Sequence, residues 1–137
     1  MFNRKTQRGF TLIELMVVVA IVAIIMAIAI PSYQEQVRKS NRGLAKSDLL
    51  ELTQCAERFH TTNGTYTGFD AAAACDVDGK DDANTYDFGT AAITRTTFTL
   101  SATAQGSQTD DKCGDLGINQ ANVRTHSAGT ATDRCWE

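Results

Sequence analysis

Residues 8–31 read RGFTLIELMVVVAIVAIIMAIAIP, and this stretch decides how the whole chain must be organised. Phe10 to Ile30 is a run of 21 residues in which only Thr11 and Glu14 are polar. As an α-helix the run would span about 30 Å, which is enough to cross a bilayer. Cations precede the run at positions 4, 5 and 8, with no acid among them. The positive-inside rule therefore places this end in the cytoplasm and the rest of the chain outside.

Three interpretations fit a short basic segment followed by an apolar run. The first is an ordinary signal peptide, with Ala27-Ile28-Ala29 as its small-residue cleavage site. The second is a plain single-pass anchor. Neither accounts for Glu14, because a carboxylate at the centre of a membrane helix costs roughly 3 kcal/mol, and less near an end. The third is a membrane helix that is built to associate, in which a partner group meets this carboxylate.

The residues Arg8-Gly9-Phe10-Thr11-Leu12-Ile13-Glu14-Leu15 resemble the leader motif of type IV pilins. The resemblance implies that a prepilin peptidase cuts after Gly9 on the cytoplasmic side and that Phe10 is then N-methylated. It also implies that the apolar helices bundle in a filament, where Glu14 of one subunit faces the Phe10 amine of a neighbour. A cut after Gly9 leaves the apolar run attached, so the subunit is stored in the membrane until it assembles.

The resemblance divides the chain into a leader at residues 1–9, a transmembrane and filament-core helix at residues 10–31, and a globular domain at residues 32–137. Pro31 predicts a kink or a local unwound stretch, since proline lacks an N–H and clashes with the preceding turn. The Asn63-Gly64 pair should end the following helix as a turn. Between them a 3–4 spacing of apolar residues predicts an amphipathic helix packed on a sheet; its stripe consists of Ala45, Leu49, Leu52, Ala56 and Phe59.

The remainder of the chain has strand patterns. Between residues 97 and 104, apolar positions alternate with Thr and Ser, which predicts a strand with one buried face. Residues 114–119 and 123–127 are shorter candidates, and residues 119–122 form the turn between them. These elements predict an α+β fold, with a long N-terminal helix, transmembrane and then amphipathic, packed on a small antiparallel sheet. The pilin resemblance implies the same architecture.

Four cysteines occur in a small domain that is expected to be exported: Cys55, Cys75, Cys113 and Cys135. An even count in that setting predicts disulfides. Zinc is the alternative, but there is no C-x-x-C pair and no histidine at ligand spacing. Three connectivities are open. We favour Cys55–Cys75, which would tie the helix to the loop after it, and Cys113–Cys135, which would pin the C-terminal strands; each closes a loop worth about 3 kcal/mol.

The net charge is −3, and it becomes −6 once the three cations of residues 1–9 are removed. An acidic body argues against general nucleic-acid binding, which needs a basic surface to neutralise phosphates. The segment Asp76–Asp82 could hold calcium, but its glycine follows the second aspartate directly and no bidentate glutamate follows at EF-hand spacing. We therefore interpret it as a solvated turn and expect no metal and no cofactor.

No set of residues predicts catalysis. His60 and His126 have no Ser, Cys or carboxylate pattern around them that would form a catalytic group, and no Gly-rich phosphate loop is present. Trp136 next to Cys135 is interpreted as a cover for a disulfide. We therefore predict a protein that is not an enzyme.

Two later segments, residues 49–66 and 98–116, together with Cys135-Trp136, look like PilE-type minor pilins. The resemblance implies a structural subunit of a filament that serves adhesion, twitching motility or DNA uptake. Its partners would be other pilin subunits, prepilin peptidase and an inner-membrane assembly platform driven by a cytoplasmic ATPase. It would lie in the inner membrane as a single-pass, N-in protein and afterwards in the extracellular pilus. The alternatives are a pseudopilin of type II secretion, which shares the leader, and a membrane-tethered module that binds DNA or another ligand.

Overall fold

The computed structural model describes residues 9–75, 85–127 and 132–137. The chain forms two compact units, residues 1–36 and residues 37–137. Helix α1 (Leu12–Asn63) supplies residues to both units. Residues 32–36 are exposed turns of α1, and the second unit begins at Val37. The division into a leader, a membrane helix and a globular domain, which the resemblance implies, stays a prediction.

The first unit contains the N-terminal half of α1, and its described side chains are all exposed. The most apolar window of 18 residues has a mean hydropathy of 3.1 and no buried residue. By length and composition, α1 is the one helix in the described part of the chain that could cross a membrane. An apolar surface of this size requires a cover, either lipid or other protein chains.

Helix α1 continues without interruption through Pro31, so the unwound stretch that was one of the two outcomes expected there is wrong, and the kink stays a prediction. A proline inside a helix removes one hydrogen bond and crowds the carbonyl four residues earlier, but the adjacent turns keep their bonds. The helix ends at Asn63, as the Asn63-Gly64 pair predicted. Gly64 has a φ of +70° and donates its N–H to the carbonyl of His60 at 2.7 Å. Glycine takes this left-handed conformation without steric cost, which explains the position of the helix end.

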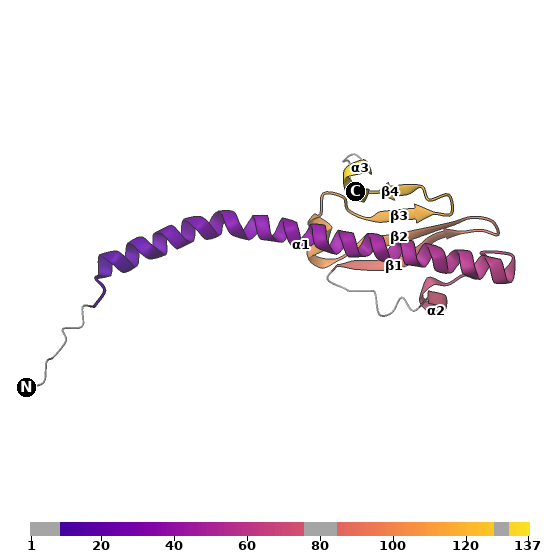
Figure 1. The fold of residues 1–137 in the computed structure, drawn as a ribbon, viewed down its shortest axis with the longest axis horizontal. Coiled ribbons are helices and arrows are strands. Elements are labelled where there is room, and N and C mark those ends of the chain that lie inside the picture. Colours follow the sequence, from indigo (N-terminus) through magenta and orange to yellow (C-terminus); the bar gives the residue numbers. More distant parts are fainter. Residues whose placement is uncertain (1–8, 76–84, 128–131) are drawn as a thin grey trace, which may run out of the picture. The chain divides into compact units, whose positions relative to one another are not determined.

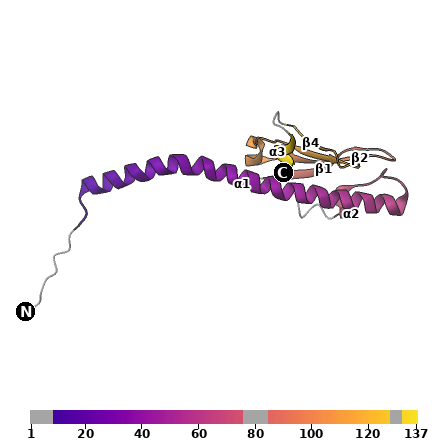
Figure 2. The ribbon, with the colours of Figure 1, turned by 45° about the horizontal axis from the view of Figure 1, so that its top comes forward.

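The second unit packs the C-terminal half of α1 against one face of a four-stranded antiparallel sheet (Figure 1; Figure 2). The strands lie in chain order: β1 (Tyr86–Ile93), β2 (Phe98–Ala104), β3 (Leu116–Asn119) and β4 (Arg124–His126). Strands β2, β3 and β4 correspond to the three that the sequence predicted. In the predicted turn after β3, Asn119 Oδ1 accepts hydrogen bonds from the amides of Ala121 and Val123, at 3.0 and 2.9 Å.

Four elements were not predicted: β1, the short helices α2 (Ala71–Cys75) and α3 (Thr132–Trp136), and the 3₁₀ turn η2 (Gly106–Asp110). The pattern of β1 is weak because only Tyr86 and Phe88 alternate before a Gly-Thr-Ala-Ala stretch of low strand propensity. Its pairing with β2 also shifts register between Thr90 and Ala92, which breaks the period of two. Pairing with β2 therefore determines the extended conformation of β1 more than the strand propensity of its own residues does.

The core lies between α1 and the inner face of the sheet. The predicted helix stripe is confirmed: Ala45, Leu49, Leu52 and Ala56 are at most 2% exposed, and Phe59 packs against the core partly buried. The predicted strand face is confirmed as well, since the four alternating apolar residues of β2 are buried. Burying one leucine or phenylalanine contributes about 1.5–3 kcal/mol. This stripe therefore fixes which side of α1 meets the sheet.

Candidate functional site

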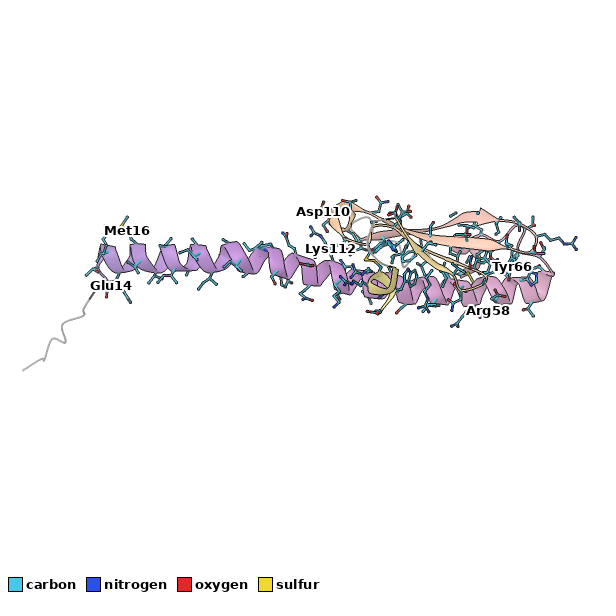
Figure 3. The ribbon with its side chains drawn as sticks, turned by 90° about the horizontal axis from the view of Figure 1, so that it is seen from above. Glu14, Met16, Arg58, Tyr66, Asp110 and Lys112 are labelled. Carbon is cyan, nitrogen blue, oxygen red and sulfur yellow. A yellow bond between two sulfur atoms is a disulfide. The ribbon has the colours of Figure 1, made fainter. Side chains whose placement is uncertain are left out.

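Glu14 lies at the N-terminal end of α1 (Figure 3). There it forms a capping box with Thr11. Glu14 Oε2 accepts hydrogen bonds from the backbone N–H of Thr11 at 2.9 Å and from its hydroxyl at 2.8 Å. In return, the Glu14 N–H donates to Thr11 Oγ1 at 3.3 Å. These bonds satisfy amide groups that the first turn of a helix leaves without partners. The Glu14 carboxylate thus has two donors within its own chain, before any neighbouring subunit meets it.

The capping box was not predicted, although its pattern is present in the sequence. Thr11, two apolar residues and Glu14 form a T-x-x-E pattern directly before an apolar run, which is the pattern of a capping box. Both hydrogen bonds from Thr11 go to Oε2. A carboxylate can accept about four hydrogen bonds, so Glu14 keeps acceptor capacity for a further partner.

Gly9 and Phe10 lie just before this box. Phe10 is 90% exposed, and a side chain built at Gly9 would meet no atom within 4 Å. The backbone of Gly9 is also outside the left-handed region that favours glycine. The fold therefore does not require glycine at this position.

The two disulfides are Cys55–Cys75, with Cα atoms 6.1 Å apart, and Cys113–Cys135, with Cα atoms 5.7 Å apart. These are the two pairs that we favoured from the sequence. The first joins α1 to α2, and the second joins the segment before β3 to α3. Trp136 packs against the buried core, in which Cys113 and Cys135 both lie. The second disulfide thus fixes the C-terminal tail to the body of the domain.

A buried polar cluster holds the first turns of α1 in this unit against the segment after η2. Asp111, with 1% of its side chain exposed, forms an ion pair with Arg42, with 13% exposed. Asp111 also accepts hydrogen bonds from Gln108 Nε2 at 2.7 Å and from the N–H of Cys113 at 2.8 Å. Gln108 is fully buried and its Nε2 also donates to the carbonyl of Arg38 at 3.0 Å. No sequence pattern could have predicted this cluster, because its members are about 70 residues apart in the chain.

Two groups extend this buried cluster. Burial raises the pKa of Tyr86, whose hydroxyl accepts a bond from Gln108 Nε2 at 3.3 Å. Nearer the surface, Arg38 donates to the carbonyl of Ser107 at 3.0 Å and pairs with Asp110 at 3.1 Å. Asp110 has 73% of its side chain exposed, so this second pair is screened by solvent. The buried Arg42–Asp111 pair therefore contributes more to the stability of the domain than the exposed Arg38–Asp110 pair does.

A surface of positive charge lies where α1, β4 and α3 meet. We call Lys39, Lys46, Arg124 and Trp136 the C-terminal basic surface. Lys46 Nζ donates to the main-chain oxygen of Glu137 at 2.6 Å, and the guanidinium of Arg124 lies 5.4 Å from the centre of the Trp136 ring. Partial burial lowers the pKa of Lys46, and repulsion from Arg42, Lys39 and Arg124 lowers it further. Arg42, Lys39 and Arg124 thus each lie near enough to Lys46 to disfavour its charged form.

The remaining candidates from the sequence are the acidic segment and the two histidines. The acidic segment Asp76–Asp82 lies outside the described residues. Within the described ranges, no group of three or more His, Cys, Asp or Glu side chains is arranged to hold a metal ion. His60 stacks on Tyr66 with ring centres 4.3 Å apart, near the end of α1. His126 Nδ1 is buried, with no hydrogen-bond partner among the described residues.

The N-terminal half of α1 is exposed and long enough to cross a membrane, and its C-terminal half packs on a four-stranded antiparallel sheet. Together with the two disulfides, this arrangement defines a pilin-class fold. Residues 4–30 match the family described as "Prokaryotic N-terminal methylation motif". Residues 31–117 match the family described as "Type IV minor pilin ComP, DNA uptake sequence receptor". The chain belongs to the type IV pilin family and is a structural, minor subunit of a type IV pilus.

Known relatives agree. The chain is 34% identical over 134 residues to "Type IV major fimbrial protein FimA" of Dichelobacter nodosus, covering 96% of this chain and 74% of the relative. It is 51% identical over 53 residues to a "Fimbrial protein" of Pseudomonas aeruginosa, covering 39% of this chain and 34% of the relative. The solved non-core minor pilin PilV of Neisseria meningitidis shares the fold, with a TM-score of 0.55, 18% identity, and coverage of 72% of this chain and 95% of that one. The methylation motif and the fimbrial relatives imply assembly with other pilin subunits and processing by prepilin peptidase.

Proposed function

We propose that this minor pilin is cut after Gly9, N-methylated on Phe10 and docked in the pilus through Glu14. Before assembly it would span the inner membrane once with its N-terminus in the cytoplasm, and an inner-membrane platform would then insert it into the filament. The observation that supports this most directly is the capping box, in which the Glu14 carboxylate, in the first turn of α1, accepts hydrogen bonds from Thr11, the residue that follows Phe10.

The box explains how a carboxylate can enter a membrane in this position. A buried polar group costs free energy unless it has hydrogen-bond partners, and Thr11 supplies two of them within the same subunit. In the filament, the amine of a neighbour's Phe10 would donate to the lone pairs of the Glu14 carboxylate that Thr11 does not occupy. Only a subunit docked at one axial offset brings the two charges together, so the pair would select the register.

Intact-mass analysis of the membrane-extracted protein tests the processing. We expect a mature chain that begins at Phe10 and carries one added methyl group. Gly9 is open and its replacement would not strain the fold, so Gly9→Val should leave the domain folded and accumulate the uncut precursor. A mature chain that begins at Ile30 would instead indicate cleavage by an ordinary signal peptidase.

A second function, capture of DNA by the assembled pilus, is favoured by the C-terminal basic surface. The family that matches residues 31–117 carries the description of a DNA uptake sequence receptor. The body as a whole is acidic, with a charge of −6 for residues 10–137, which disfavours indiscriminate binding to phosphates. We therefore propose selective rather than general DNA binding, alongside the structural role.

Selection of duplexes from a random-sequence pool tests this second function. The full-length chain in detergent micelles should enrich duplexes that share one sequence motif, because a net acidic protein gains little from non-specific phosphate contacts. The same chain, heat-denatured with its disulfides reduced, serves as the control. A pool that stays random after repeated rounds would count against DNA capture, and would leave the structural role untouched.

A further inference from the structure

We infer that a groove between α1 and the edge strand β1 is the binding site for an apolar side chain of a neighbouring pilin subunit. The inference goes beyond the docking proposed for Glu14. That docking concerns the first turn of α1, whereas the groove belongs entirely to the second unit. The groove would hold the globular part of this subunit against its neighbour in the filament.

The groove has a volume of about 210 Å³ and is lined by one face of α1 and by the start of β1. Strand β1 is at one edge of the sheet, so this side of it has no strand beside it (Figure 1). The residues of α1 are spaced by three and four positions, which places them on one helix face. They are Asn41, Leu44, Ala45 and Asp48, and they face Tyr86 and Phe88 of β1.

Leu44 distinguishes this groove from ordinary surface. It is 64% exposed, more than any other large apolar side chain that the structure describes in the second unit. One exposed leucine needs no explanation. Leu44, however, lies beside Ala45 and Phe88, which belong to the buried core. A partner that covered Leu44 would therefore extend the core of the domain, and an apolar hollow flanked by polar residues is typical of a protein contact.

The size of the groove favours a side chain over a free ligand. Pockets for small molecules usually measure about 300–1,000 Å³ and enclose most of the ligand. The groove is smaller than that range. A single anchoring side chain that fills a small hollow is the common arrangement at the centre of a protein interface.

The role of the chain identifies the partner. This protein is a structural subunit of a pilus, and its relatives imply assembly with other pilins. Helix α1 runs without a break from its exposed apolar half into the second unit. There Val37, 38% exposed, lies seven residues before Leu44 and hence on the same helix face. The groove is thus carried by the same helix whose apolar half other chains cover in a filament.

Replacing Leu44 by alanine tests the contact. Its share in sheared filaments should fall about fivefold at equal membrane levels, because alanine removes most of the apolar surface that the neighbour would bury. Leu44→Met keeps an apolar side chain of similar volume and should assemble as wild type does. Leu50→Ala is the matched control, since Leu50 is 37% exposed on the same helix and lies about 120° around it from Leu44. Alanine favours a helix, so both alanine variants should keep α1 intact.

A photoreactive benzophenone amino acid in place of Leu44 identifies the occupant. When the variant is co-expressed with the other pilus components, ultraviolet light should join it to another pilin in sheared filaments. Mass spectrometry of the digested product names the partner. The same amino acid in place of Leu50 should give little of this product. Cells that lack the assembly platform should give none, because the subunits then stay apart in the membrane.

Several results would overturn the site. One is an equal filament share for Leu44→Ala and Leu50→Ala, and another is a cross-link confined to lipid, to the same chain or to a protein that is not a pilin. A larger fall in melting temperature for Leu44→Ala than for Leu50→Ala would mean that Leu44 acts in the fold instead. The role of Glu14 is tested separately. Normal assembly of Glu14→Ala beside poor assembly of Leu44→Ala would remove the docking through Glu14 and leave the groove, and the opposite pair of results would remove the groove alone.

Discussion

Replacing Glu14 by alanine is expected to reduce the share of this subunit in sheared filaments about tenfold or more, at equal membrane levels and with normal cleavage after Gly9. The loss would leave the neighbour's Phe10 amine without a partner in an apolar bundle, and removing one member of a buried ion pair costs about 3–5 kcal/mol. The measurement compares mutant and wild-type subunit in filaments when each is co-expressed with the other pilus components.

Two further variants separate the charge of Glu14 from its role in the capping box. Glutamine can occupy the same position of a capping box, so Glu14→Gln keeps the cap but removes the charge. Thr11→Val keeps the charge but removes the hydroxyl that caps the helix, at a cost of about 1 kcal/mol. We expect Glu14→Gln to assemble as poorly as the alanine variant, and Thr11→Val to assemble nearly as well as wild type. Normal incorporation of Glu14→Gln would mean that apolar packing alone sets the register.

Replacing Asp111 by alanine is expected to destabilise the globular unit by about 3–5 kcal/mol, because it leaves the Arg42 guanidinium buried without its carboxylate. The substitution also removes the acceptor for the Cys113 N–H and for Gln108 Nε2. A loss of 1 kcal/mol lowers the melting temperature of a domain of this size by about 4–8 °C. The fall should therefore exceed about 12 °C in thermal unfolding followed by near-ultraviolet circular dichroism.

The exposed pair beside it provides the control. Asp110→Ala removes the partner of Arg38 at the surface, and such pairs contribute less than about 1 kcal/mol. A double replacement of Arg42 by methionine and Asp111 by leucine should cost less than Asp111→Ala, since it removes both buried charges together. If Asp110→Ala and Asp111→Ala lowered the melting temperature equally, the buried cluster would have no special part in holding α1.

Local patterns in the sequence predicted much of this protein. The apolar run, the amphipathic stripe of α1, the helix end at Gly64 and the alternation in β2 each depend on neighbours within a few residues. The capping box could have been predicted in the same way and was overlooked. Pro31 shows the limit of a local rule, because a strong helix breaker is accommodated within a longer continuous helix. Strand β1 shows another, since its residues favour no structure strongly until β2 pairs with them.

The sequence by itself determined the class of protein, because the methylation motif and the helix of membrane length both lie in one contiguous segment, residues 4–30. The tertiary structure alone decided the rest. The Arg42–Asp111 pair joins groups 69 residues apart, and the basic surface collects cations from α1 and β4 beside an aromatic ring from α3. No periodicity links such residues, since their proximity follows from the burial of the α1 stripe on the sheet and from the disulfide that fixes the tail.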